Sequence, residues 1–273
     1  MKINMVNIVF WVYLLLFLLF PHIVETEPAE NCVSLDSLQG EWLNKKYIET
    51  LQLTKSPRKA VEGIYYTAFT ILKDANSYKW GQLYNFHEGI YYNIIELLPT
   101  SEFNMYQIQY EPIYEPETPE TVERATYTNN FLIYGKPPIN EIKWIFKPRY
   151  GYPKGEEQRI TFVRVEPNID EYVNRIVLAG TYFDKQGRIF VFSMTGDAEW
   201  PDKSYRYQVS LDTVLSDSDY FIVYIISDEE KKRSMIYAFE WQDNTLHIFN
   251  IHFPEGGDHI KHDKEPLYIL TPR

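Results

Sequence analysis

The feature that most constrains the fold is a long succession of short segments in which aromatic and β-branched residues alternate with polar ones. Turn-forming residues such as Asp74-Ala75-Asn76-Ser77 and Gln242-Asp243-Asn244 separate them. Alternation with a period of two is typical of strands with one buried face. The segments predicted as strands are residues 64–72, 78–86, 89–98, 103–110, 131–134, 142–146, 159–165, 176–183, 188–194, 205–211, 220–226, 235–241 and 246–253.

So many short strands predict an all-β protein in which an antiparallel meander closes into a barrel. Closure removes the unpaired sheet edges that would otherwise promote aggregation. A β-sandwich or two β domains remain open as alternatives. One short helix is predicted over residues 45–54, where Tyr47, Ile48 and Leu51 form an apolar stripe that Ser56-Pro57 ends. We expect this helix to cover one edge of the core; a gated lid is the alternative.

The N-terminus carries an uninterrupted apolar run over residues 8–20, shortly after Lys2. A transmembrane helix needs about 20 residues, so this run matches the core of a secretory signal peptide better. Residues 1–31 are therefore interpreted as an export signal and a flexible start. The sequences at Val24-Glu25-Thr26 and Ala29-Glu30-Asn31 are imperfect cleavage sites, which leaves an uncleaved anchor as an alternative.

The remaining residues, 32–273, are predicted to form a single large β domain with a Pro-rich insertion near residues 99–153. Half of the protein's 16 prolines lie in that stretch. Because proline cannot donate a hydrogen bond to a sheet, the stretch must consist largely of loops and sheet edges. It is also the best candidate for a domain boundary.

Cys32 follows the export segment and resembles the acylated first residue of bacterial lipoproteins, although Asn31 replaces the small residue usual before it. Acylation would tether the protein to a membrane, and an unmodified thiol is the alternative. The chain has one Cys and no Asn-x-Ser/Thr acceptor, which favours a bacterial exported protein. We expect it in the periplasm or associated with the outer membrane or cell surface, or alternatively secreted.

The formal net charge of −11 has the wrong sign for a general nucleic-acid-binding protein, whose affinity comes largely from cations at phosphates. We therefore expect no nucleic-acid partner. The sequence leaves the oligomeric state open.

A family resemblance begins at Leu38-Gln39-Gly40-Glu41-Trp42. A short turn, Gly-x-Trp and an antiparallel meander resemble the opening of lipocalins and of the wider calycin group of ligand-binding barrels. The resemblance implies that Trp42 packs across the closed end of the barrel. The helix after Trp42 departs from lipocalins and is similar to the helical cap of fatty-acid-binding proteins. A second Leu-x-Gly-x-aromatic, at Leu178-Ala179-Gly180-Thr181-Tyr182, indicates either two related barrel-like halves or chance; chance is favoured because the flanking residues do not align.

The resulting functional hypothesis is non-covalent binding of a small apolar or amphipathic ligand. Apolar strand faces and a few orienting polar groups are the chemistry that such pockets use, although the same faces also describe an ordinary aromatic core. The candidate ligand-binding residues are Trp80, Gln82, Tyr84, Arg164, Gln208 and Tyr237. The alternative function is a structural or adhesive envelope protein that binds a protein or glycan through the Pro-rich rim.

Catalytic templates are missing: the chain has no Gly-x-Ser-x-Gly, no Gly-rich phosphate loop and no His-Glu-x-x-His. This favours a protein that is not an enzyme and uses no cofactor, with a hydrolase that uses His259 or His262 as a third possibility. Asp197-Glu199 and Asp217-Asp219 are interpreted as turns. The C-terminal cluster is interpreted as a solvated loop rather than a metal site; its residues are His252, Asp258, His259, His262 and Asp263.

Overall fold

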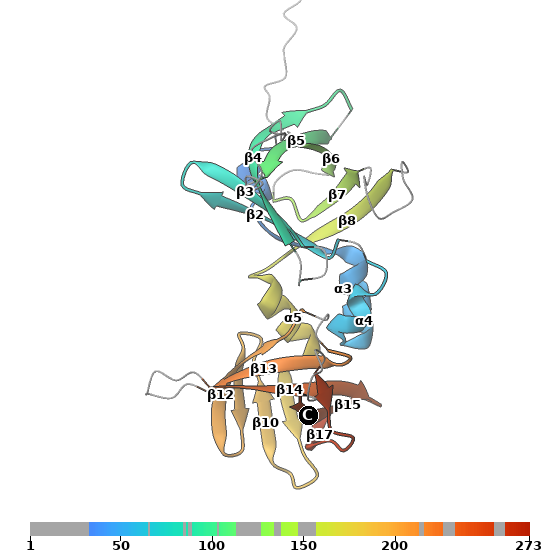
Figure 1. Ribbon diagram of the computed structural model, residues 1–273, viewed down its shortest axis with the longest axis vertical. Helices are drawn as coiled ribbons and strands as arrows, with labels where there is room; N and C mark the ends of the chain where they lie inside the picture. Colours follow the sequence, from blue (N-terminus) through green and yellow to red (C-terminus); the bar gives the residue numbers. More distant parts are fainter. Residues whose placement is uncertain are drawn as a thin grey trace, which may run out of the picture. The chain divides into compact units, whose positions relative to one another are not determined.

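The computed structural model contains two antiparallel β-sheets and four short helices within the residues that it describes (Figure 1). The described residues are 33–64, 66–83, 86, 89–102, 104–112, 127–133, 138–146, 157–212, 216–225, 233–253 and 260–273. The predicted export segment, Cys32, Tyr84, Asp258, His259 and much of the Pro-rich stretch lie outside them. Residues Val33–Arg273 form one compact unit. The assignment of residues 32–273 to a single domain stays a prediction.

The first sheet closes on itself as an eight-stranded barrel, here called the first barrel (Figure 1). Each strand pairs with the next in antiparallel register, and β1 pairs with β8 to complete the closure. The predicted all-β fold with a closed antiparallel barrel is therefore confirmed. Its strands are β1 (Gly40–Asn44), β2 (Ala68–Asp74), β3 (Ser77–Leu83), β4 (Gly89–Pro99), β5 (Met105–Pro112), β6 (Tyr127–Ile133), β7 (Glu141–Phe146) and β8 (Gln158–Val165).

The second sheet has nine strands in the order β14-β13-β12-β11-β10-β9-β17-β15-β16, with an additional pairing between β14 and β15. β17 pairs with both β15 and β9, and β14 pairs with β15. The pairings therefore form a ring that begins and ends at β9 and includes every strand of this sheet except β16. Its strands are β9 (Gly180–Phe183), β10 (Ile189–Phe192), β11 (Asp197–Trp200), β12 (Lys203–Val209), β13 (Asp219–Ile225), β14 (Arg233–Gln242), β15 (Thr245–His252), β16 (Lys261–His262) and β17 (Tyr268–Pro272).

The predicted helix is confirmed as α3 (Lys45–Thr54), with Tyr47, Ile48 and Leu51 buried. Pro57 opens a further helix, α4 (Pro57–Val61), at the first helical position where its missing N–H costs nothing. The short turn expected before the Gly-x-Trp motif contains instead the helix α2 (Leu35–Leu38).

The strand predicted over residues 176–183 is wrong in its first part, because Ile176 and Val177 end the helix α5 (Ile169–Val177). Ile169, Val173 and Val177 recur every four residues and are buried, which is a helical stripe. Asn168 caps this helix by accepting a hydrogen bond from the Glu171 backbone N–H at 2.8 Å. The Asn-x-x-Glu spacing is a helix-start signal that the strand interpretation missed.

The interpretation of Asp197-Glu199 as a turn is also wrong. Both residues lie in β11, where they are exposed while Ala198 and Trp200 between and after them are buried. Asp219, likewise expected in a turn, begins β13. Acidic residues on the solvent face of a short strand resemble a turn in composition but keep the strand period of two.

The two Leu-x-Gly-x-aromatic motifs have the same structural role. Each glycine begins the first strand of its sheet, β1 or β9. The Trp42 indole N–H donates to the carbonyl oxygen of Leu38 at 3.0 Å, and the Tyr182 hydroxyl donates to that of Leu178 at 2.7 Å. In both cases the aromatic side chain binds the backbone four residues earlier, and the leucine is fully buried.

Aromatic side chains fill the interior of the first barrel. Phe69 lies 4.8 Å from Phe162 and 5.7 Å from Trp80 between ring centroids, and Trp80 lies 5.0 Å from Phe131. A second apolar cluster joins α3, α4 and α5 to the inner face of the second sheet. The helices therefore share a core with the second sheet.

Candidate ligand-binding site

The predicted ligand-binding residues do not form one site. Trp80 and Gln82 lie two residues apart on β3 and are both buried, so they share the inner face of the first barrel. The Trp80 indole N–H is buried and has no hydrogen-bond acceptor among the described residues. Tyr84 lies outside those residues.

Arg164 packs at the end of the first barrel that α2 covers. Its guanidinium carbon lies 4.8 Å from the centre of the Trp42 ring, and its Nη2 donates to the carbonyl oxygen of Ser37. Burial lowers the pKa of Arg164. Arg164 on β8 therefore contacts both Trp42 and α2. Trp42 is fully buried at this end of the barrel, as the family resemblance implies.

Gln208 and Tyr237 belong to the second sheet. Partial burial raises the pKa of Asp170, and a hydrogen bond from Gln208 opposes that rise. The Tyr237 ring packs 5.4 Å from Trp200 and 5.6 Å from Phe221. Neither residue shares a site with Trp80 and Gln82.

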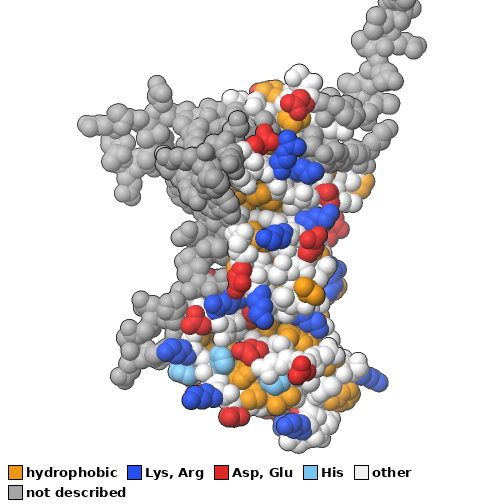
Figure 2. Space-filling model, turned by 90° about the vertical axis from the view of Figure 1, so that its right-hand side faces the viewer, with side chains coloured by type: hydrophobic (Ala, Val, Ile, Leu, Met, Phe, Trp, Pro, Cys, Tyr) orange, Lys and Arg blue, Asp and Glu red, His pale blue; other side chains and the backbone are white. Residues whose placement is uncertain are grey.

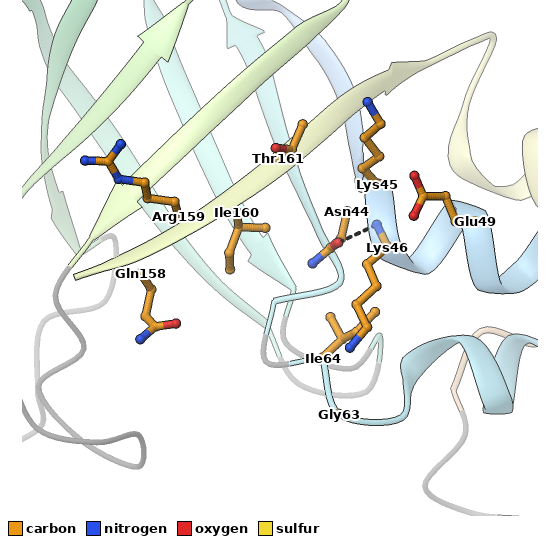
Figure 3. A pocket seen from close by; sticks show the side chains of 10 residues that line it. All are labelled: Asn44, Lys45, Lys46, Glu49, Gly63, Ile64, Gln158, Arg159, Ile160 and Thr161. Carbon is orange, nitrogen blue, oxygen red and sulfur yellow. Dashed lines mark hydrogen bonds between the residues drawn. The ribbon is translucent and has the colours of Figure 1, made fainter. Parts of the chain in front are cut away.

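A cavity of about 320 Å³, lined by both polar and apolar side chains, lies at the other end of the first barrel. β1 runs from Gly40, next to α2, to Asn44, where α3 begins, so the cavity lies at the end opposite Trp42 and α2. We call it the mouth pocket (Figure 3). Its lining residues are Asn44, Lys45, Lys46, Glu49, Gly63, Ile64, Gln158, Arg159, Ile160 and Thr161.

Asn44 fixes the geometry of the mouth pocket. Its side-chain oxygen accepts a hydrogen bond from the Lys46 backbone N–H at 2.9 Å, and its Nδ2 donates to the carbonyl oxygen of Tyr66 at 2.9 Å. Asn44 thus ends the strand, caps the helix and binds the neighbouring chain segment. These bonds hold the first turn of α3 at the edge of the barrel.

The strand β8 supplies the opposite wall. In Figure 3, Gln158 and Ile160 point to one side of β8, toward the space beside Asn44, and Arg159 and Thr161 point to the other. This is the alternation expected of a strand. Ile160 also packs against the aromatic cluster in the barrel, so the pocket ends where the aromatic filling begins.

Two of the three cations that line the mouth pocket have carboxylate partners. Lys45 Nζ lies 3.0 Å from Glu141 Oε2, and Arg159 Nε lies 2.8 Å from Glu157 Oε1. Lys46 has no ion pair within the described part of the chain. Among the described residues the pocket therefore combines the ammonium of Lys46, the amide of Gln158 and the apolar side chains of Ile64 and Ile160.

The sequence contained a signal for this site that the apolar-stripe argument overlooked. Asn44 is a typical helix cap, and the two residues after it are lysines with no acid in the first turn. Cations are unfavourable at the positive end of the helix dipole. The stability of the helix therefore does not explain the two lysines at its start.

Two of the C-terminal histidines, His252 and His262, lie next to carboxylates. His252 lies 3.6 Å from Asp263, and His262 lies 3.8 Å from Glu240. Within the described ranges no group of three or more metal-ligating side chains occurs. On the face that Figure 2 shows, basic and acidic side chains are interspersed rather than segregated.

No helix in the described part of the chain is both long and apolar enough to cross a bilayer. No protein-family model matches the sequence, and the searches of curated proteins and of solved structures give no significant match.

Proposed function

We propose that the protein is an exported, calycin-like binding protein that holds a small amphipathic ligand non-covalently in the mouth pocket. The observation that carries this proposal is the cavity itself, which combines an apolar wall with a cation and an amide. Its volume of about 320 Å³ lies at the lower end of the range of roughly 300–1,000 Å³ found for small-molecule sites.

The aromatic filling of the first barrel argues against a ligand deep inside it. Phe69, Phe131 and Phe162 are fully buried and pack against the neighbouring indoles of Trp80 and Trp144. A deep ligand would have to displace several of these rings. Close packing in protein interiors makes such displacement costly.

The proposal is tested by filling the pocket. We expect Ile160→Trp to weaken binding of an environment-sensitive amphipathic dye at least tenfold, because the larger side chain occupies the cavity. Leu53→Trp is the matched control, since Leu53 lies on α3 and is 86% exposed. Fluorescence titration measures the affinities, and circular dichroism establishes that both variants are folded.

Equal dye binding by Ile160→Trp and the wild-type protein would contradict a ligand site in the mouth pocket. Native mass spectrometry of protein before and after solvent extraction gives an independent measurement. A ligand that co-purifies with the wild-type protein and is lost in Ile160→Trp would support the proposal.

The export part of the proposal rests on the apolar run over residues 8–20 and on Cys32. We expect the full chain, made in a bacterium, to leave the cytoplasm. The intact mass distinguishes an uncleaved anchor, a cleaved chain and a chain acylated at Cys32, with Cys32→Ser as the control for acylation.

A further inference from the structure

The first turn of α3 concentrates positive charge at the mouth pocket. Lys45 and Lys46 occupy the first two helical positions, and no acidic residue lies in that turn. The N-terminal end of a helix already carries a partial positive charge. The two lysines therefore repel the helix end, and an anion in the pocket would relieve that repulsion.

Of the three cations that line the pocket, Lys46 is the one without an ion pair to a described residue, so it is available to such an anion. Glu141 holds Lys45 at 3.0 Å and Glu157 holds Arg159 at 2.8 Å. Glu49 also lines the pocket, but Figure 3 shows the Lys46 side chain extending toward Ile64 and away from the Glu49 carboxylate. Since Lys46 forms no ion pair with any residue that the structure describes, its positive charge is available to a bound carboxylate.

Polar and apolar groups are arranged to bind the two ends of one small molecule. Gln158 can donate from its amide, as Lys46 does from its ammonium, and both line the pocket with Ile64 and Ile160. Ile160 pairs across the sheet with Trp144, which is buried in the aromatic filling. That filling limits the depth available to the apolar part of a ligand.

We infer that the mouth pocket selects small organic carboxylates with a short, compact apolar body. The carboxylate contacts the Lys46 ammonium and the Gln158 amide, and the apolar body contacts Ile64 and Ile160. This inference rests on the proposed function, because it specifies the ligand class of the same site. It adds that the ligand is negatively charged and that its apolar part is small.

Three probes with the same apolar body test the inference: phenylpropionate, phenylpropanol and phenylpropylamine. We expect the wild-type protein to bind phenylpropionate at least tenfold more tightly than phenylpropanol, and phenylpropylamine most weakly. Lys46→Met should abolish the difference between acid and alcohol while binding of the alcohol persists. Lys46→Arg should preserve it, because the positive charge remains.

Glu49→Gln should strengthen phenylpropionate binding severalfold by removing a nearby negative charge. The matched control is Lys185→Met, which removes a lysine from the turn before β10. It should leave the preference for the acid unchanged. Calorimetric titration measures the affinities at low and high salt, and the preference should shrink at high salt because screening weakens ionic attraction.

The failure of this inference is distinguishable from the failure of the proposed function. If phenylpropanol binds as tightly as phenylpropionate, and Ile160→Trp blocks both, the ligand site stands and its preference for carboxylates is refuted. If a preference for the acid survives in Lys46→Met, another group holds the anion and the assignment of Lys46 is wrong. If none of the probes binds at millimolar concentration, the carboxylate inference is refuted, and the dye titration with Ile160→Trp decides the proposed function separately.

Discussion

The first barrel and the second sheet begin in the same way and differ in what lies at their other ends. In each, a short helix leads to a buried leucine, a glycine opens the first strand, and an aromatic side chain donates to the leucine carbonyl. The same local sequence therefore covers one end of each sheet. The neighbours of the aromatic residue differ, since Arg164 stacks on Trp42 whereas Trp241 and Phe192 pack against Tyr182.

The opposite ends differ more strongly. In the first barrel the mouth pocket, with its mixed polar and apolar lining, lies beside Asn44 and β8. In the second sheet, Trp200 lies near the β11–β12 connection and packs at 5.3–5.5 Å from Tyr205, Tyr237 and Tyr268. Aromatic side chains thus fill this end of the second sheet. The comparison teaches that the cavity beside Asn44 lies where the aromatic filling of the first barrel stops.

The largest expected effect comes from removing either opening aromatic residue. Trp42→Ala and Tyr182→Ala should each lower the free energy of unfolding by about 3–5 kcal/mol, the usual cost of deleting a large buried aromatic side chain. Urea unfolding followed by circular dichroism and by tryptophan fluorescence measures the change. A single transition that shifts as a whole would show that the two sheets unfold together; two transitions, with only one shifted, would show separate domains.

Gly40 and Gly180, which begin β1 and β9, should be sensitive to substitution for different reasons. Gly40 has a φ of +127°, and a Cβ there would make only an ordinary van der Waals contact with the Arg164 side chain, at 3.8 Å, so Gly40→Ala should cost about 1–2 kcal/mol through the backbone alone. At Gly180 a Cβ would lie 3.2 Å from the Tyr182 hydroxyl oxygen, so Gly180→Ala should displace that ring. Double-mutant cycles that combine Gly180→Ala with Tyr182→Phe, and Gly40→Ala with Trp42→Phe, measure the coupling energy between each glycine and its aromatic residue. Additive effects at Gly180 would contradict this distinction.

Tyr182→Phe removes one hydroxyl and leaves the Leu178 carbonyl without its side-chain donor. We expect a loss of about 1–3 kcal/mol at neutral pH, the cost of an unsatisfied buried polar group. Val177→Ala, which shortens a neighbouring buried side chain without touching this hydrogen bond, is a control for general loosening of the core. A Tyr182→Phe protein as stable as the wild type would show that the hydrogen bond contributes nothing.

The same variant should change the response to alkaline pH. Burial raises the pKa of Tyr182 to about 12, above the value of about 10 for an unfolded tyrosine. The unfolded state therefore loses its proton first, and stability falls as the pH rises from about 10 to 12. Tyr182→Phe should lose less stability over that interval. Burial also raises the pKa of Tyr47 and Tyr207, so part of the decline should remain.

The smallest effect is expected at the rim of the mouth pocket. Lys45 and Glu141 form an ion pair in which both side chains are 47% exposed. Solvent screens such pairs, so Glu141→Gln should change the free energy of unfolding by less than about 1 kcal/mol. Glu141→Gln should instead weaken the binding of a positively charged ligand and strengthen the binding of a negatively charged one. Titration with the charged probes measures both affinities. A large loss of stability would show that the pair supports the barrel itself.

The period-two alternation was sufficient to predict most strands because each strand has one buried and one exposed face. Tyr205, Tyr207 and Val209, for example, are buried as expected. Strand prediction failed where a short helix and a strand are consecutive, as at Ile176 and Val177. It also failed where acidic residues occupy an exposed strand face, as at Asp197 and Glu199, since composition there outweighed periodicity.

The candidate site was harder to predict. Trp80 and Gln82 lie two residues apart on one strand, so their common buried face follows from the sequence, and their role in ligand binding stays a prediction. Arg164, Gln208 and Tyr237 were joined to them only by residue type, and the structure places them elsewhere. Lys46 and Gln158 are far apart in the sequence, and no local pattern relates them.

The sequence by itself determined the antiparallel β class, the helix after Trp42 and the aromatic character of the interior, because strand period, helix period and burial of apolar surface act locally. Only the tertiary structure decided that β1 meets β8, that the second Gly-x-aromatic opens another sheet, and that a cavity remains beside Asn44. Closure pairs strands from distant parts of the chain, and the volume left over depends on how all their side chains pack together.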